Sequence, residues 1–502
     1  MSTQVLVVGA GPVGMTLALA LRRQGLAVRL VDKSGERTDK SKALVIWPRT
    51  LELLDIQGCA QGFVDAGVCA RAVRIHSEQR ELVHARFDLA RSAYPFALMI
   101  PQSETERLLE QRLAASGVQI ERQVELLSFE DDGASVHAQL RHGDGREEGT
   151  SVAWLAACDG AHSTVRHALG LTFDGDTLDS GWVLADVQLD GELPNDEMTI
   201  CWRPEGVLVL LPMGARRFRV IAETGSAADT SAPTLAQVQS LLDSRGPQGL
   251  RAHDPVWLSR FHINERKVRD YRHGRIFLAG DAAHVHSPAG GQGMNTGMQD
   301  AFNLAWKLAL VLNDKATPAL LDSYSTERSA IGRQVLDRTG RMTRIALLHN
   351  PLLRELRDLA AGTLSRLPAI RQRLVDQLCE LDLHYTHSPL SATPHAAAAQ
   401  PQAGARAPDV ALDSVDSRAT RLHALLGGGC FVLLSVGAAS PGVPPALQAL
   451  VTTACVGSAE GYAAGHHYLV RPDGYLALST RQEDPAPIFG YLQRLVSFPA
   501  PG

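Results

Sequence analysis

A short stretch near the start of the chain, VVGAGPVG, has the residue types and spacing of a phosphate cradle. Gly9, Gly11 and Gly14 form a GxGxxG pattern: the first glycine permits a tight turn, the second lets the backbone approach a pyrophosphate, and the third allows close helix packing. A predicted strand precedes the pattern and a predicted helix follows it. Asp32 ends the next predicted strand, where a carboxylate can bind ribose hydroxyls. The stretch therefore predicts a dinucleotide site in a βαβ unit.

Two later segments carry carboxylates at the ends of predicted strands. ACDGAHSTVRHALG contains Asp159, and GDAAHVHSPAGGQGMN contains Asp281. Beside helix-terminal amides, such a carboxylate can bind the hydroxyls of a ribityl chain, which nicotinamide cofactors lack. The amides of Gly293, Met294 and Asn295 could face a flavin ring at the edge where negative charge develops on reduction. These segments favour a flavin as the bound cofactor.

The composition limits the kind of partner. At 502 residues the chain exceeds one hydrophobic core, since cores stop growing near roughly 250 to 300 residues, and two or three domains are expected. A net charge of −5 offers no broad basic surface to nucleic acid, and the 45% apolar content is that of an ordinary globular protein. Small molecules are the expected partners.

Cysteine usage and apolar runs indicate the compartment. The seven cysteines are scattered and form no CxxC pair, so neither a disulfide framework nor a zinc site is predicted. The run GVLVLLPMG is too short to span a bilayer, and MSTQVLVV has no basic region typical of a secretory signal. We expect a cytoplasmic protein without a membrane span.

The predicted elements divide the chain into five parts. Alternating strands and helices occupy residues 1–174, short strands with turn residues occupy 175–270, and helices dominate 271–385. A stretch rich in Ala, Pro and Gln predicts a linker over 386–405, and a last unit with an apolar strand and a hairpin covers 406–502. The fold class predicted is α/β.

Together the three motifs resemble the signatures of the class A flavoprotein monooxygenases, the aromatic hydroxylases similar to para-hydroxybenzoate and phenol hydroxylase. They are GxGxxG, a DGxxSxVR-type segment and GDAAHxxxPxxGQGxN, and the likeness covers about residues 1–345. The last unit, with GARAPD and RPDGYLAL, resembles the branch that includes 3-hydroxyphenylpropionate hydroxylase and bacterial aromatic polyketide oxygenases. The resemblance implies a Rossmann-type FAD-binding domain in two parts, a β-sheet substrate domain over 175–270 and a C-terminal thioredoxin-like domain without CxxC.

The resemblance also implies a role for individual residues. Gln102 matches a glutamine near the ribityl and phosphate groups, and the Val124 backbone matches the adenine edge. Asp159 and Arg166 match the motif tied to both the flavin and the reduced nicotinamide, and Pro288 matches the loop proline beside the reactive face of the flavin. No side chain is predicted to be catalytic, because the chemistry belongs to the flavin. The implied FAD-binding residues are Gly9, Gly11, Pro12, Val13, Gly14, Asp32, Lys33, Lys42, Gln102, Val124, Asp159, Arg166, Asp281, Pro288, Gly293, Met294 and Asn295.

Lys42 departs from the family, which usually has arginine at this position. Lysine keeps the positive charge but loses the planar fork that binds phosphate in two places. We therefore expect weaker FAD retention or altered flavin mobility.

The implied reaction uses NADPH or NADH, FAD and O2. A hydride passes to FAD, oxygen adds to give a flavin C4a-hydroperoxide, and one oxygen atom goes to a phenolic or polycyclic aromatic substrate. Since the chain has one dinucleotide fingerprint, the nicotinamide is expected to bind transiently. The alternatives are a Baeyer–Villiger oxygenase of a polyketide ketone, a flavoprotein that inactivates an aromatic antibiotic, and a non-enzymatic FAD-binding sensor; the protein is expected to be a monomer or homodimer.

His284 and His286 form an HxH pair that could suggest a metal. The sequence places no acidic or cysteine partners beside them, so we expect them to structure the loop and predict no metal site.

Overall fold

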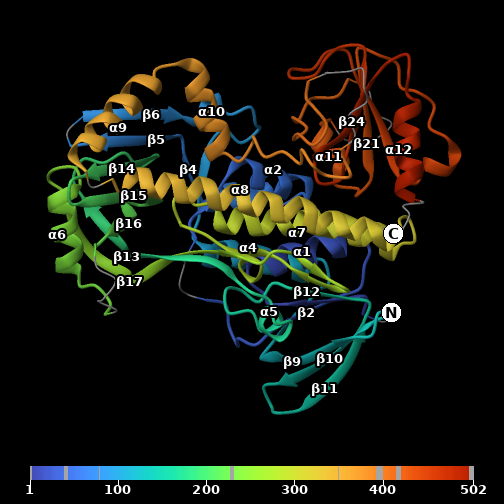
Figure 1. Ribbon diagram of the computed structural model, residues 1–502, viewed down its shortest axis with the longest axis horizontal. Helices are drawn as coiled ribbons and strands as arrows, with labels where there is room; N and C mark the ends of the chain where they lie inside the picture. The colour runs from blue at the N-terminus through green and yellow to red at the C-terminus, as the bar shows by residue number, and fades with distance from the viewer. Residues whose placement is uncertain are drawn as a thin grey trace.

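The computed structural model describes residues 3–38, 43–78, 80–225, 231–348, 350–391, 400–413 and 420–496. Figure 1 shows a central body of sheet and helices, a second sheet at one end and a C-terminal unit at the other. None of the described helices is both long and apolar enough to cross a membrane. Residues 392–399 of the predicted linker lie outside the described residues.

The central body is built on a six-stranded sheet in the order β18-β19-β12-β1-β2-β8. All neighbours in it are parallel except β18 and β19. The sequence VLVV of β1 is wholly buried, as expected of a parallel strand covered on both faces. The predicted Rossmann-type architecture is confirmed. Its strands are β1 (Val5–Val8), β2 (Val28–Asp32), β8 (Ile120–Arg122), β12 (Trp154–Ala157), β18 (Arg272–His273) and β19 (Ile276–Leu278).

Helices on this sheet come from distant parts of the chain. Helix α1 (Pro12–Arg23) packs against α4 (Gln102–Ala115) and α7 (Gly293–Leu312). Strand β19 pairs with β12, so the chain returns at residue 272 to complete the sheet it left after residue 157. Because parallel strands end at the same edge, this return brings the second glycine-rich loop beside the first.

An eight-stranded sheet in the order β20-β17-β13-β16-β15-β14-β5-β6 forms the end body. It extends beyond the expected segment 175–270, because β5 from residue 72 pairs in parallel with β14 and brings β6 with it. Helix α6 (Leu235–Arg245) covers one face. The strands are β5 (Ala72–Ser77), β6 (Arg80–Arg86), β13 (Asp174–Asp190), β14 (Glu197–Arg203), β15 (Gly206–Gly214), β16 (Arg217–Glu223), β17 (Arg251–Lys267) and β20 (His284–Val285).

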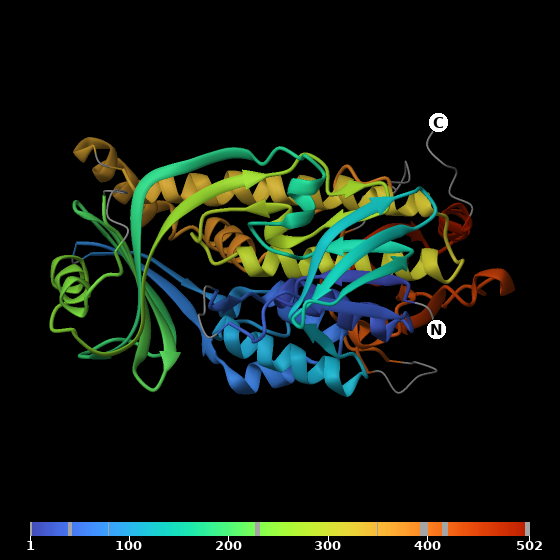
Figure 2. The same ribbon diagram turned by 90° about the horizontal axis from the view of Figure 1, so that it is seen from below.

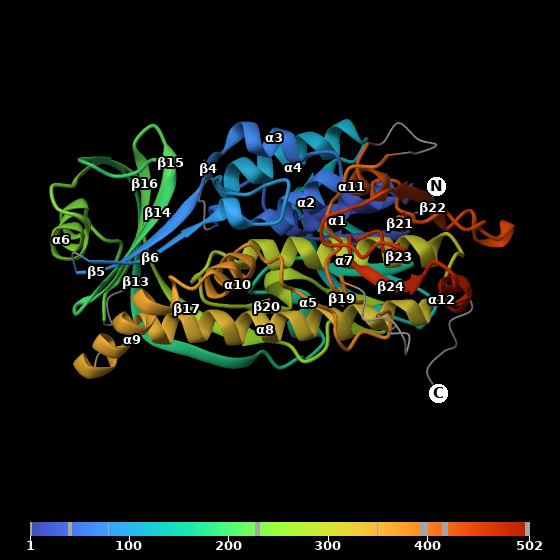
Figure 3. The same ribbon diagram turned by 90° about the horizontal axis from the view of Figure 1, so that it is seen from above.

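The three helices that follow α7 connect the central body to the end body. Figure 2 shows the long α8 (Asp322–Ala346) running alongside α7, and Figure 3 shows α9 (Pro351–Leu364) and α10 (Pro368–Leu378) near the end body. Smaller elements complete the central body. They are α2 (Pro48–Ile56), α3 (Ala60–Ala66), α5 (Thr164–Ala168), β3 (Val45–Ile46), β4 (Val68–Ala70), β7 (Ala97–Met99), β9 (Val124–Asp131), β10 (Val136–His142) and β11 (Glu147–Val152).

The C-terminal unit has a four-stranded mixed sheet in the order β22-β21-β23-β24. The predicted hairpin is present between β23 and β24, with Gly474 at φ +71° in the turn. Cys430 and Cys455 are both free. The elements are α11 (Leu422–Leu426), β21 (Phe431–Val436), β22 (Val451–Val456), β23 (His466–Val470), β24 (Leu476–Arg481) and α12 (Ala486–Val496).

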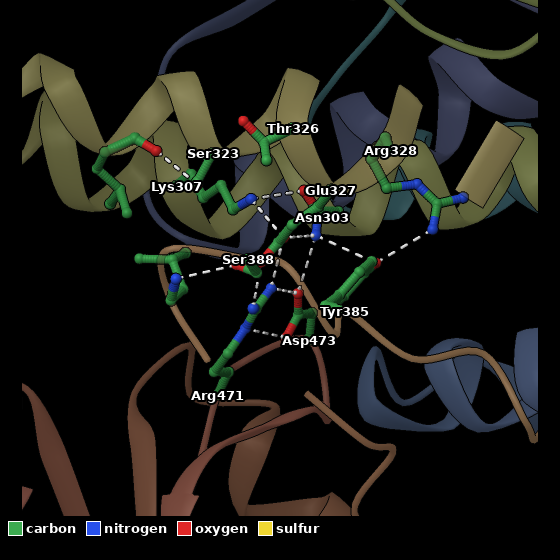
Figure 4. A network of polar contacts seen from close by, with 12 residues as sticks. Asn303, Lys307, Ser323, Thr326, Glu327, Arg328, Tyr385, Ser388, Arg471 and Asp473 are labelled. Carbon is green, nitrogen blue, oxygen red and sulfur yellow. Dashed lines mark hydrogen bonds and ion pairs between the residues drawn. The ribbon is translucent and has the colours of Figure 1, made fainter. Parts of the chain in front are cut away.

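Buried charges attach the C-terminal unit to α7 and α8 (Figure 4). Glu327 accepts hydrogen bonds from Arg471 Nη1 at 2.6 Å and from Lys307 Nζ at 2.7 Å, and Arg471 also binds Asp473. All four side chains are almost completely shielded from solvent. Such a cluster holds only when every charge is paired, so it fixes how the C-terminal unit sits on the two helices.

Candidate active site

The first glycine loop joins β1 to α1. A Cβ on Gly9 would lie 2.3 Å from the Cys158 carbonyl oxygen, and one on Gly14 would lie 1.9 Å from the Gly9 carbonyl oxygen. A Cβ on Gly11 would meet no described atom within 4 Å. Gly9 and Gly14 are therefore required for packing, whereas Gly11 leaves space next to the N-terminus of α1 for a ligand.

Asp32 closes the same loop from the end of β2. Its carboxylate accepts hydrogen bonds from the backbone N–H of Ala10 at 2.6 Å and of Ser34 at 2.7 Å. These contacts hold the carboxylate beside the glycine loop, at the position expected for the ribose.

The middle motif lies across the sheet edge from that loop. Asp159 Oδ2 accepts from the Val165 N–H at 3.2 Å, and Asp159 Oδ1 is buried without a hydrogen-bond partner among the described residues. Arg166 is buried, and its guanidinium donates to the carbonyls of Ala161 at 2.7 Å and Ala282 at 3.1 Å. Arg166 thus ties the middle motif to the second glycine loop.

The second glycine loop continues from β19 into α7. Asp281 is exposed at its start, and Gly290 and Gly291 have φ values of +85° and +63°. Trp47 Nε1 donates to the Gly290 carbonyl at 2.8 Å. The positive φ values explain why glycine occupies both positions at the bend.

Asn295 anchors this loop to the strand and loop at 45–47. Its amide accepts from the Trp47 N–H at 2.9 Å and donates to the carbonyls of Val45 at 2.9 Å and Gly291 at 3.0 Å. The side chain is fully buried. Asn295 therefore shapes the loop from behind, a role that its position in the motif did not reveal.

A buried ion pair between Asp300 and Arg328 supports the same loop. Asp300 on α7 accepts from Arg328 Nε at 2.6 Å, from the Gly280 N–H at 3.0 Å and from His284 Nε2 at 2.9 Å. Burial favours a higher pKa for Asp300, but Arg328 and His284 outweigh burial and its pKa is lowered. No local pattern in the sequence marks this pair, because aspartate and arginine on helices usually face solvent.

The two histidines of the HxH pair stack with rings 6.2 Å apart and 8° from parallel. His286 Nδ1 bonds to the Ser287 carbonyl oxygen at 3.0 Å, and burial lowers the His286 pKa to about 4. Among the described residues, no group of three or more His, Cys, Asp or Glu side chains is arranged to hold a metal ion.

The loops open into one cavity of about 1510 Å³. One end is formed by the glycine loops and the middle motif. The other is formed by the face of the eight-stranded sheet opposite α6, where apolar side chains predominate, and by α8, α9 and α10. The predicted residues that line it are Gly11, Pro12, Val13, Lys33, Gln102, Asp159, Asp281, Pro288, Gly293 and Met294.

The other predicted residues do not line the cavity or lie outside the described residues. Gly9, Gly14, Asp32, Val124, Arg166 and Asn295 are not among the residues that line it, and Lys42 lies outside the described residues. Val124 is buried at the start of β9.

Polar groups on the sheet side of the cavity are few. Arg219 on β16 reaches the cavity wall, and its Nε and Nη2 each lie 2.8 Å from a carboxylate oxygen of Asp186. His84 also reaches the wall from the sheet, and α9 and α10 contribute Arg357, Arg371, Arg373 and Gln377. No sequence pattern identified these groups or the walls from β5, β6 and α8 to α10, because their neighbours are distant in the chain.

The arrangement fits an extended dinucleotide with a planar ring. Helices α1 and α7 both begin at the cavity, and in neither does a described side chain cap the first turn, so backbone N–H groups can bind an anionic group there. The open space at Gly11 and the unpaired Asp159 Oδ1 fit a ligand that approaches the backbone and brings hydrogen-bond donors.

Comparison with known families decides which ligand this is. The model of the FAD binding domain family matches residues 2–339, and that of the aromatic-ring hydroxylase C-terminal family matches residues 400–497. The chain belongs to the FAD-dependent aromatic-ring hydroxylases. It is an FAD-dependent monooxygenase that uses NAD(P)H, as predicted.

Individual relatives of this hydroxylase agree with the family. The chain is 39% identical to a 6-methylpretetramide 4-monooxygenase of Streptomyces rimosus over 77% of its length and 71% of the relative. It is 34% identical to a 12-dehydrotetracycline 5-monooxygenase/anhydrotetracycline 6-monooxygenase of Streptomyces rimosus subsp. rimosus, over 96% of both chains. A solved anhydrotetracycline hydroxylase from Streptomyces rimosus superimposes with a TM-score of 0.82 at 30% identity, covering 100% of both chains.

Proposed function

We propose that this hydroxylase acts on a fused-ring, polyketide-type phenol, with O2 as the second substrate. The supporting observation is the continuity of the cavity, in which one space connects the proposed flavin loops to an apolar sheet face. Its volume of about 1510 Å³ exceeds the roughly 300–1,000 Å³ of a typical small-molecule pocket. A cavity of this size accommodates both a flavin ring and a large aromatic substrate.

The walls of the substrate end support a hydrophobic ligand. Each strand that faces the cavity contributes apolar side chains, while the charged Arg219 is already paired with Asp186. A small carboxylated phenol would leave much of this surface wet, whereas a multi-ring phenol would cover it. The relatives named for 6-methylpretetramide and anhydrotetracycline support the same substrate class.

The proposed FAD site assigns a task to each loop. The N–H groups of Gly11 and Val13 bind the pyrophosphate, Asp32 receives the ribose hydroxyls, and Asp281 receives the ribityl hydroxyls. The amides at Gly293 and Met294 face the ring. Gly9, Gly14, Arg166 and Asn295 hold these loops in position, and Gln102, Lys33 and Val124 border the remaining part of the cofactor.

Bound in this way, FAD supplies the redox chemistry, taking electrons from NAD(P)H and activating O2 for transfer to the substrate ring. The chain contributes orientation and a dry site. Pro288, Gly290 and Gly291 line the cavity beside the proposed ring, and the apolar sheet face excludes water from the reacting end.

The test is substrate-stimulated oxidation of NADPH and NADH by the FAD-loaded enzyme. The panel contains single-ring phenols, with and without a carboxylate, and three-ring and four-ring phenols. We expect multi-ring phenols to accelerate flavin reduction most and to yield a product with one added oxygen atom. Failure of every aromatic compound to accelerate reduction would refute the proposal, and an ester in the NMR spectrum of the product would indicate a Baeyer–Villiger reaction instead.

The proposal also concerns the compartment and the oligomeric state of the enzyme. All seven cysteines are free, which supports a reducing compartment such as the cytoplasm. Light scattering of the purified FAD-loaded protein distinguishes a monomer from a homodimer.

A further inference from the structure

Large apolar side chains gather on one exposed surface beside the cavity mouth. Eight of the eleven large apolar residues found exposed in the described part of the chain lie between residues 342 and 367. We call these eight the leucine patch. Its members are Met342, Ile345, Leu352, Leu353, Leu356, Leu359, Leu364 and Leu367.

Helix α9 carries most of the patch and presents apolar side chains in two directions. Leu353, Leu356 and Leu364 line the cavity. Leu352 and Leu359 do not line it, and they are 75% and 60% exposed. Figure 3 shows α9 at one corner of the molecule, projecting beyond α8. Solvent-facing leucines on a projecting helix are not needed to close the cavity and indicate a surface that contacts a partner.

Positive charge surrounds the patch, although the whole chain has a net charge of −5. Residues 341–378 contain seven arginines but three acidic residues. The charges of Arg357 and Asp358 cancel, since Asp358 Oδ1 accepts from Arg357 Nε at 2.8 Å and the Arg357 side chain is 7% exposed, which leaves six arginines against two acidic residues. The seven arginines are Arg341, Arg344, Arg354, Arg357, Arg366, Arg371 and Arg373.

We propose that the leucine patch docks on the surface of an anionic phospholipid bilayer, with α9 lying in the interface and the cavity mouth facing the lipid. Leucines that enter the acyl boundary and arginines that contact lipid phosphates are the features of an interfacial amphipathic helix. A second copy of the chain fits less well, because a two-fold contact would place the arginine-rich surface against itself.

Docking in this orientation gives the cavity a direct supply of apolar compounds. Met342, Ile345, Leu353, Leu356 and Leu364 belong both to the patch and to the cavity wall. A hydrophobic compound dissolved in the bilayer can therefore enter without crossing water. This consequence for substrate uptake rests on the proposed substrate class, whereas docking itself does not.

Flotation of the full-length FAD-loaded protein with lipid vesicles tests the docking. Vesicles of phosphatidylcholine alone are compared with vesicles that also contain phosphatidylglycerol. We expect binding to the mixed vesicles that weakens as salt is raised, since salt screens the arginines. The double variant Leu352→Glu/Leu359→Glu is expected to lower the bound fraction by about fivefold or more.

Val256→Glu is the matched control, because Val256 is 69% exposed on β17 and lies outside the patch. It should bind vesicles like the natural protein, and all variants should retain FAD and substrate-free NAD(P)H oxidation. Absence of binding to the mixed vesicles, or equal loss in the control, would overturn the proposal. A dimer in solution that the Leu352→Glu/Leu359→Glu variant dissociates would assign the patch to a second copy and overturn it as well. None of these readouts uses the substrate, so failure here is distinct from failure of the proposed function.

Discussion

Arg328 Nε lies 2.6 Å from Asp300 Oδ1, and both side chains are fully buried. The same carboxylate accepts a hydrogen bond from the N–H of Gly280, the residue before Asp281. Arg328 also donates to the Thr296 carbonyl at 3.0 Å in the second turn of α7. The pair therefore links α8 to both ends of the second glycine loop.

Asp300→Asn tests this link. The amide keeps the shape of the carboxylate but leaves the buried Arg328 charge without a counter-charge, which costs about 3–5 kcal/mol when a buried pair is broken. We expect a loss of this size in the free energy of unfolding, together with weaker FAD retention. Denaturant titration measures the first effect and flavin fluorescence after gel filtration measures the second.

Arg338→Gln is the control, because Arg338 pairs with Asp382 where both side chains are 20–25% exposed. A partly exposed pair is worth about 1 kcal/mol or less, and it lies away from the glycine loops. If Arg338→Gln and Asp300→Asn lose FAD equally, the loop-supporting role of Asp300 is wrong.

Gly11 and Gly14 are expected to respond differently to alanine. A Cβ on Gly14 would lie 1.9 Å from a backbone oxygen, so Gly14→Ala should destabilise the fold by about 1–3 kcal/mol through overpacking. A Cβ on Gly11 enters open space, so Gly11→Ala should fold normally but bind FAD about tenfold more weakly, equivalent to about 1.4 kcal/mol. Thermal unfolding of the apoprotein and FAD titration separate the effects; equal FAD affinity in Gly11→Ala and the natural protein contradicts the proposed phosphate contact.

Glu380 predicts a pH dependence of stability. It is buried and accepts from Gln299 Nε2 at 2.5 Å, and burial raises its pKa to about 8 from an ordinary value of 4.5. The folded state then binds more protons than the unfolded state between these values, so stability should fall by several kcal/mol as pH rises from about 4.5 to about 8. Urea unfolding at a series of pH values measures the slope.

Glu380→Gln should remove this part of the slope and be more stable than the natural protein above pH 8, because no charge has to be buried. Glu355→Gln on the exposed surface of α9 is the control and should leave the slope unchanged. The raised pKa of Glu380 is contradicted if the natural protein and Glu380→Gln show the same change in the free energy of unfolding between pH 4.5 and pH 8.

The local motifs were predictable and the contacts between distant residues were not. Gly9, Gly11 and Gly14 act within one strand-turn-helix unit, so their spacing carries their meaning. Asn295 has its role through Trp47, which lies 248 residues earlier, and no local pattern marks that contact. Strands β5 and β6 joined the second sheet for the same reason, since strand pairing depends on the whole fold.

The cavity walls illustrate the same limit. The cluster of basic residues at Arg366, Arg371 and Arg373 favours a solvated surface, yet Arg371 and Arg373 line the cavity. Amphipathic periodicity identifies a helix with two unlike surfaces, but it does not distinguish bulk solvent from a cavity or a bilayer.

Lys42→Arg tests the departure from the family at this position. Arginine offers a planar fork for phosphate that lysine lacks, so the variant should hold FAD more tightly, by about tenfold at most if one bidentate contact is gained. FAD titration and the rate of flavin reduction by NADPH are the measurements. Unchanged values for both would show that Lys42 does not contact the cofactor.

Val209→Phe tests the proposed size of the substrate. Val209 faces the cavity from β15, and a phenyl ring there would occupy space on the apolar wall without touching the glycine loops. We expect kcat/KM for multi-ring phenols to fall by about tenfold or more, which is 1.4 kcal/mol of lost stabilisation, while that for single-ring phenols changes little. FAD affinity should be unchanged.

Val256→Phe, on the exposed edge of β17, controls for the added ring. If Val209→Phe lowers kcat/KM equally for small and large phenols, the sheet face does not select substrates by size. The proposal of a multi-ring substrate then loses its structural basis.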